Sequence, residues 1–113
     1  MEKLRDQHEK TFLNASAGVL SALARMFSQV GGVERAALFG SRARGDFSDR
    51  SDYDVAVFGE LSATEIAHLR SACREELPTL HKIDLIFVNE VTDKKFLQSI
   101  QTEGIVFYDK TAK

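Results

Sequence analysis

The fold of this chain is decided by residues 40–54, which read GSRARGDFSDRSDYD. The stretch begins where an apolar run ends in a Gly-Ser pair, and it closes with two carboxylates, Asp52 and Asp54, with one residue between them. A third carboxylate, Asp84, interrupts another apolar run, residues 83–88. Burying acids in strand-like segments is costly unless a positive group meets them. A divalent metal that carries a nucleoside triphosphate would supply that positive charge.

The three acids are expected to converge. Side chains alternate along a strand, so Asp52 and Asp54 share one face, while Tyr53 and its i+2 neighbours point into the core. If the strand carrying Asp84 is a neighbour, all three carboxylates meet, and they resist ionisation unless a cation binds. Magnesium prefers such oxygen ligands, and two ions about 3.5–4 Å apart can clamp an in-line phosphoryl displacement. The sequence therefore predicts Asp52, Asp54 and Asp84 as catalytic, metal-binding residues for two Mg2+ ions.

The Gly-Ser pair predicts a phosphate-binding turn. Gly40 lets the backbone approach a triphosphate, and Ser41 opens a short helix whose first amides can point at its oxygens. Arg42 and Arg44 follow at once and can neutralise phosphate charge. The predicted nucleotide-binding residues are thus Gly40, Ser41, Arg42 and Arg44. The glycine spacing of a Walker A loop occurs here too, but its lysine and Ser/Thr are missing, so that motif is excluded.

Hydrophobic periodicity predicts alternating helices and strands. We expect an α/β (α+β) fold in which a sheet of about four strands packs against helices. The capping-box sequence at 62–65 opens one helix, Thr92 or Asp93 caps another, and Gly31-Gly32 stops the first. Whether the strands run parallel stays open at this point. The expected helices span 5–30, 62–77 and 92–104, and the expected strands span 33–39, 52–58, 81–88 and 105–108, with a frayed tail beyond 109.

Composition sets limits on the function. The 113 residues fit one domain, 1–113, with a net charge of -2 that gives no global attraction to long nucleic acids or anionic membranes. One cysteine, Cys73, excludes an internal disulfide, and it falls on the apolar stripe of a helix, where a buried thiol is expected. No signal peptide and no run of ~20 apolar residues is present, so we expect a cytoplasmic protein.

Each feature also has a structural interpretation. The paired aspartates could be surface residues of an edge strand, Asp84 could face water beside Lys82, and the Gly-Ser pair could be an ordinary turn. Arg42 and Arg44 could belong to a solvated loop. The functional interpretation is favoured because all parts occur in order and at workable spacing.

The pair Gly40-Ser41, ten intervening residues and then Asp52-Tyr53-Asp54 resembles the signature of the DNA polymerase β-type nucleotidyltransferase superfamily. The stretch is especially similar to the minimal nucleotidyltransferases, the MNT proteins. Asp84 matches the third carboxylate of the family, and the resemblance covers residues 33–108. It implies a palm-like fold with a central mixed sheet, and an enzyme whose aspartates hold both metals.

The resemblance also implies a partner and a reaction. Small prokaryotic members commonly pair with an all-helical HEPN ribonuclease and act as its antitoxin, transferring AMP from ATP to a tyrosine of the toxin. Tyr53 departs from the family pattern, because an aliphatic residue is usual there. Larger relatives carry a helical domain that grips the acceptor, and these 113 residues leave no room for it, so we expect the acceptor to be presented by another chain or to bind an open cleft.

Three functions therefore follow from the sequence. The leading one is a magnesium-dependent protein adenylyltransferase that uses ATP. The second is a catalytically silent antitoxin or nucleotide-binding module that blocks its partner by occlusion. The third, less favoured, is nucleotidyl transfer to a small molecule such as an aminoglycoside. Nucleotide choice, the acceptor and any homo- or hetero-oligomer stay open.

Overall fold

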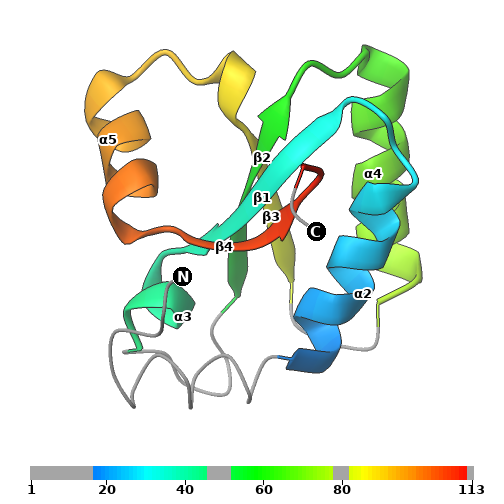
Figure 1. Ribbon diagram of the computed structural model, residues 1–113, viewed down its shortest axis with the longest axis horizontal. Helices are drawn as coiled ribbons and strands as arrows, with labels where there is room; N and C mark the ends of the chain where they lie inside the picture. Colours follow the sequence, from blue (N-terminus) through cyan, green and yellow to red (C-terminus); the bar gives the residue numbers. More distant parts are fainter. Residues whose placement is uncertain (1–16, 46–51, 78–81, 112–113) are drawn as a thin grey trace.

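A computed structural model describes residues 17–45, 52–77 and 82–111. Its mixed four-stranded sheet has the order β3-β2-β1-β4 (Figure 1). Strand β1 pairs antiparallel with both β2 and β4, whereas β2 and β3 run parallel, which settles the strand directions that the sequence left open. The elements are α2 (Ala17–Ser28), β1 (Val33–Phe39), α3 (Ser41–Arg44), β2 (Tyr53–Gly59), α4 (Ala63–Glu75), β3 (Ile83–Phe87), a 3-10 turn η1 (Val88–Glu90), α5 (Lys94–Glu103) and β4 (Ile105–Asp109).

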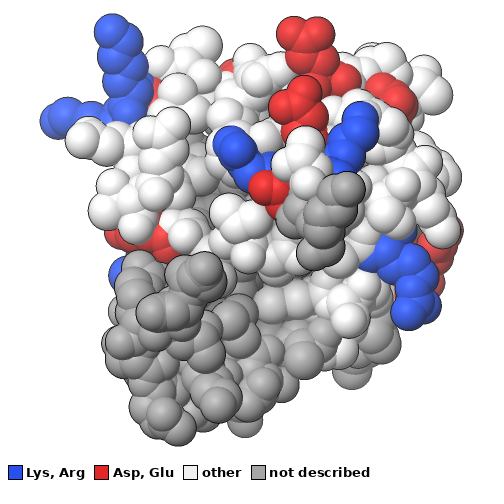
Figure 2. All heavy atoms as spheres, viewed as in Figure 1, with Lys and Arg blue, Asp and Glu red and all other residues white. Residues whose placement is uncertain are grey.

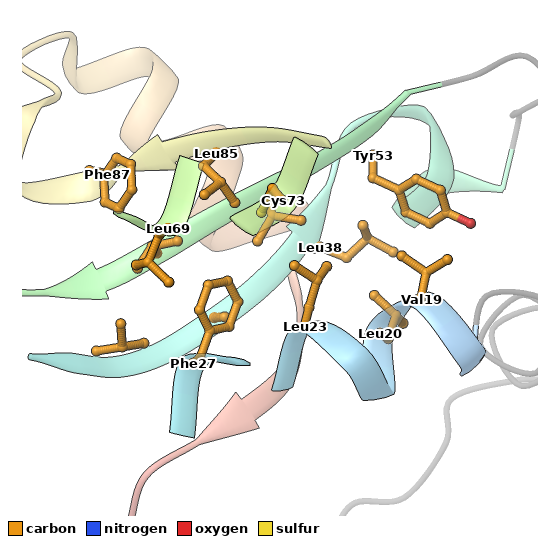
Figure 3. Close-up of a cluster of buried hydrophobic side chains, with 14 of the residues drawn as sticks. Val19, Leu20, Leu23, Phe27, Leu38, Tyr53, Leu69, Cys73, Leu85 and Phe87 are labelled. Atoms are coloured by element: carbon orange, nitrogen blue, oxygen red, sulfur yellow. The ribbon is translucent and has the colours of Figure 1, made fainter. Parts of the chain in front are cut away.

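The helices cover the two faces of the sheet unequally. Helices α2 and α4 lie on one face, and α5 lies on the other (Figure 1). We call these the core face and the α5 face. The core face carries the larger hydrophobic cluster, in which Leu23 and Phe27 of α2 and Leu69 of α4 are fully buried (Figure 3). The cluster of the α5 face is built around Phe39, Ala56 and Ile100.

The predicted helix starts are confirmed where the structure describes them. The Ser62 hydroxyl accepts from the Glu65 amide at 3.1 Å, and the Glu65 carboxylate accepts from the Ser62 amide at 2.8 Å, which completes the capping box of α4. Asp93 rather than Thr92 caps α5, where its carboxylate accepts from the amides of the first turn. Both caps satisfy amides that the helix itself leaves without partners.

Three of the differences from the predicted boundaries have a clear structural reason. Helix α2 ends at Ser28, before the glycine pair, and neither Gly31 nor Gly32 has a positive φ. A side chain on Gly32 would meet the carbonyl of Glu60, so close packing of two backbones, rather than a left-handed helix end, requires glycine there.

The other two differences follow β3 and β4. Strand β3 ends at Phe87 because the chain then tightens into the turn η1. The chain does not fray at Lys110, whose amide donates to Glu34 at 2.9 Å and whose ammonium donates to Gly31 at 3.0 Å. The start of the predicted first helix, residues 5–16, lies outside the described residues, as does Pro78, a residue type that ends helices.

The prediction of a buried thiol at Cys73 is confirmed. Cys73 is buried against the core face, and burial raises the pKa of its thiol to about 11. Its burial supports a structural role, since a reactive cysteine needs a low pKa and exposure. His68 is exposed on α4. Among the helices that the structure describes, none has the length and apolar character needed to cross a bilayer.

Candidate functional site

Two of the three predicted acids lie side by side on adjacent strands. Asp54 of β2 and Asp84 of β3 are register partners in the parallel ladder. Their neighbours in sequence, Tyr53, Val55 and Leu85, are buried in the core face, so the two carboxylates project from the α5 face. Asp84 and Asp52 are exposed, and Asp54 is half-buried. Strand alternation therefore puts Asp54 and Asp84 on one face, whereas the predicted set of three acids, with Asp52 included, does not form a group that could hold a metal by itself.

The glycine of the Gly-Ser pair lies directly against Asp54. Gly40 has φ +76°, a conformation that L side chains rarely adopt, and Phe39 before it is the register partner of Asp54. A Cβ on Gly40 would lie 3.2 Å from Cγ of Asp54 and closer still to one of its oxygens. Only glycine allows the backbone to come this close to the carboxylate. The turn at Gly40 therefore lies directly against the acid-bearing strand β2.

The electrostatics of Asp54 show that the acids influence one another. Burial, then the charges of Asp84 and Asp52, raise the pKa of its carboxyl group above the ordinary 3.8. Arg44 and Lys82 oppose this shift. Like charges that are held close together favour a bound cation, and carboxylate oxygens suit a hard ion such as magnesium. The donor set therefore fits the predicted metal.

The carboxylates do not form a closed cage. Within 17–45, 52–77 and 82–111, no three His, Cys, Asp or Glu side chains are grouped closely enough to enclose a metal by themselves. Magnesium commonly uses one or two carboxylates and completes its shell with water and substrate phosphates. An open pair, Asp54 and Asp84, with Asp52 nearby is compatible with that mode of binding.

The two predicted arginines take different places. Arg44 is half-exposed; it contacts Glu103 of α5 at 3.4 Å, and its charge acts on Asp54. Arg42 is 5% exposed, and its guanidinium lies 4.0 Å from the ring centroid of Tyr53, whose side chain belongs to the core face. Helix α3 begins at Ser41, directly after Gly40, as predicted. The placement of Arg42 differs from the phosphate contact that the sequence predicted for it.

Sequence reasoning missed two contributors to the site. Glu103, the contact of Arg44, is 59 residues away in the chain and has no local pattern that marks it. Lys82 was placed on the face of Asp84 by strand alternation but was given no role, although its charge opposes the rise in the pKa of Asp54.

Charge elsewhere is mixed. In the view of Figure 2, acidic and basic side chains are interspersed over the described surface instead of gathering into one basic patch. Binding of long nucleic acids depends on phosphate neutralisation by clustered cations. This face therefore lacks the charge pattern typical of a polynucleotide-binding surface.

Comparison with known families agrees with this geometry. Residues 21–113 match the family model described as polymerase beta, nucleotidyltransferase. The chain belongs to this nucleotidyltransferase family. The resemblance inferred from Gly40-Ser41 and the aspartates is thereby confirmed. No curated protein matches the sequence significantly.

Solved structures with the same fold include two toxin–antitoxin assemblies. A chain from a mutant of the toxin–antitoxin MntA–HpeT aligns with a TM-score of 0.60 and 21% identity, covering 81% of this nucleotidyltransferase and 71% of that chain. A toxin–antitoxin structure with AMP-PNP aligns with a TM-score of 0.56 and 18% identity, covering 96% and 76%. A putative nucleotidyltransferase from Sulfolobus solfataricus aligns with a TM-score of 0.57 and 17% identity, covering 96% and 94%. At these identities the likeness establishes the fold, which confirms the predicted mixed-sheet architecture.

Proposed function

We propose that this nucleotidyltransferase transfers AMP from ATP to a hydroxyl of a partner protein, a tyrosine of an all-helical HEPN-type toxin, and so acts as an antitoxin. The observation that carries the proposal is the contact of the Asp54 carboxylate with Gly40, with Asp84 beside it in register. That contact supports a site in which the acids lie beside a phosphate-binding turn.

Asp52, Asp54 and Asp84 would hold magnesium on the α5 face. When bound, the metal would polarise the phosphate oxygens and offset the charge that develops on the leaving pyrophosphate. Gly40 and Ser41 would hold the triphosphate through the backbone of the turn. Arg44 would add positive charge beside it, since its guanidinium already acts on Asp54.

The reaction breaks a phosphoanhydride bond of ATP and forms a phosphoester bond to the acceptor. The acceptor oxygen forms a bond to the α-phosphorus of ATP, and the bond from that phosphorus to the oxygen bridging to the β-phosphate breaks. Pyrophosphate leaves, and the hydroxyl proton passes to Asp84. Asp84 is exposed on the edge strand β3, so an acceptor on another chain can reach it.

Two comparisons support a protein acceptor and a nucleotide. Structures with the same fold come from toxin–antitoxin complexes, and one of these holds AMP-PNP. The described part of this chain supplies the sheet and its helices but no separate substrate domain. An acceptor delivered by a second protein is the arrangement that this architecture favours.

The test is label transfer. The chain is incubated with α-labelled ATP, magnesium and a candidate all-helical HEPN-type protein, and label on the candidate partner is measured. We expect Asp54→Asn and Asp52→Asn to lower transfer by about 100-fold or more, because charge stabilisation at the reacting phosphate is lost. Asp109→Asn is the matched control, since Asp109 is also a strand aspartate but lies on β4.

The outcomes separate the three functions. Undiminished transfer by Asp54→Asn rules the mechanism out. An Asp54→Asn chain that transfers no label and still protects cells from the partner indicates a binding antitoxin. Label found on an aminoglycoside instead of on protein indicates a small-molecule acceptor. Mapping of labelled partner peptides by mass spectrometry then identifies the acceptor tyrosine.

A further inference from the structure

Arg42 is the one charged side chain that is buried within the described residues, and what it contacts is an aromatic ring. Its exposure is 5%, that of Tyr53 is 4%, and the guanidinium lies 4.0 Å from the ring centroid. Burying a cation is costly unless partners compensate. A desolvated cation–π contact contributes about 2 kcal/mol, so this stack is a feature with an energetic consequence.

The Arg42–Tyr53 stack connects the turn that follows Gly40 with strand β2, on the core face of the sheet. Arg42 follows Gly40 by two residues in the turn, and Tyr53 stands between Asp52 and Asp54 on β2. Tyr53 lies at one end of the cluster of the core face (Figure 3), on the side of the sheet opposite the Asp54 carboxylate. The contact therefore ties the phosphate-binding turn to the acid-bearing strand without entering the space above them.

We infer that Arg42 is a positioning residue, which through Tyr53 holds the Gly40 turn against β2 and so fixes Asp54 relative to the turn. A phosphate ligand would have to bind on the α5 face, whereas the Arg42 guanidinium lies on the core face against Tyr53. Arg44 remains on the α5 face, where its charge acts on Asp54. The catalytic part of this inference rests on the proposed function; the stack and its effect on the turn do not.

The chain contains a matched control for this stack. Arg70 of α4 lies over the ring of Phe87 at 5.0 Å, and Phe87 is a buried residue of β3 on the same core face. This pair is at the end of β3 away from Asp84. It is the same kind of contact with an exposed cation, and it joins no part of the site, so Arg70→Gln measures the loss of a cation–π contact away from the site.

Kinetics separate positioning from direct phosphate binding. We expect Arg42→Gln and Tyr53→Leu each to lower kcat for AMP transfer by about ten- to hundredfold with little change in KM for ATP, because a displaced acid misaligns the reaction. The double variant should be no slower than the slower single variant, since both break one contact. Tyr53→Phe keeps the ring and should stay within about twofold of the parent. Arg70→Gln should leave both constants unchanged.

The opposite pattern overturns the inference. If Arg42→Gln raises KM for ATP while Tyr53→Leu does not, or if their effects on kcat multiply in the double variant, Arg42 acts on the nucleotide itself. Thermal unfolding of each variant checks that the chains compared are folded. If the parent protein transfers no label at all, the proposed function fails, and a second measurement still decides the stack.

That measurement uses tyrosine emission. The chain has no tryptophan and two tyrosines, so a Tyr108→Phe background leaves Tyr53 as the sole emitter. We expect Arg42→Gln to make Tyr53 more accessible to acrylamide quenching, and magnesium with AMP-PNP to leave quenching in the Arg42 parent unchanged. Equal quenching with and without Arg42 would overturn the stack. A quenching increase on addition of AMP-PNP would show that Arg42 leaves the ring for the nucleotide.

Discussion

The two faces of strand β2 differ in how completely they are covered. On the core face, Tyr53, Val55 and Val57 are all buried beneath α2 and α4. On the α5 face, Ala56 is buried beneath α5, but Asp54 is only half-buried. The core face of β2 is therefore covered along its whole length. The α5 face of β2 is covered at one end and open at the end that carries the acids.

The largest effect should come from breaking the core face. Phe27 is fully buried and packs near Phe107 and Tyr108, at 6.3 and 6.2 Å between ring centroids. We expect Phe27→Ala to lower the free energy of unfolding by about 3–5 kcal/mol, measured by urea denaturation, because the cavity cannot fully collapse. Phe96 of α5 is half-buried and meets Phe39 at 5.8 Å, so Phe96→Ala should cost less. Equal losses would mean that the two faces contribute alike.

The second effect tests the contact between turn and acid. Gly40→Ala should cost about 1–2 kcal/mol, because a positive φ is unfavourable for an L residue, and the new methyl group would also push Asp54 out of place. We expect loss of AMP transfer and of magnesium-dependent AMP-PNP binding, measured by calorimetry.

Gly18→Ala is the matched control for this substitution. Gly18 lies in α2 with nothing within 4 Å of an added Cβ, and alanine favours the helix, so a slight stabilisation with unchanged binding is expected. Binding by Gly40→Ala at the level of the parent would show that the close approach of the turn to Asp54 is dispensable.

The elements that local chemistry defines could be predicted from the sequence. The bounds of β1, the capping box at Ser62 and the cap at Asp93 depend on residues within a few positions of one another. The common face of Asp52 and Asp54 follows from strand alternation alone. These predictions needed no knowledge of which segments become neighbours.

What could not be predicted depends on long-range contacts. Strand direction depends on how the whole chain pairs, and the length of the connection between β1 and β2 permits either geometry. The glycine at position 32 is required by the carbonyl of Glu60, a neighbour only in the folded state. Arg42 was assigned to phosphate because an arginine after Gly-Ser suggests charge neutralisation, whereas its burial depends on Tyr53, eleven positions along the chain. Sequence spacing reveals which residues a site contains more readily than which face each one takes.

A third effect concerns the helix that closes the core face. Ser62→Ala removes the hydroxyl that accepts from the Glu65 amide and should lower the free energy of unfolding by about 1 kcal/mol in urea denaturation. Ser62 lies at the end of β2 away from Asp54, so AMP transfer should not change. A fall in transfer with unchanged stability would link the two ends of β2 and contradict the separation described above.

The smallest effect concerns the cost of keeping acids together on the open end. Asp54 and Asp84 are register partners in the parallel ladder, and like charges directly opposite each other destabilise a sheet. Without magnesium, Asp54→Asn should therefore raise the free energy of unfolding slightly at neutral pH, while transfer is lost. The pKa of Asp54 in the folded state is raised above its ordinary value of 3.8. The parent therefore loses stability as the pH rises through that folded-state pKa, and the parent and Asp54→Asn should become equally stable at a pH well below it.

Asp109 should show the opposite sign under the same conditions. Hydrogen bonds from the side chain and amide of Thr111 hold the pKa of Asp109 below its ordinary value, so the ionised carboxylate stabilises the folded chain above that pKa. Asp109→Asn should thus be less stable than the parent at neutral pH. The two should be equally stable at a pH low enough to protonate Asp109 of the parent in both its folded and its unfolded state. Paired urea denaturation in EDTA at neutral and acidic pH measures both differences. If Asp54→Asn also lowers the free energy of unfolding at neutral pH, the Asp54 carboxylate is held by favourable contacts in the folded chain. The acids on the α5 face would then not destabilise the fold.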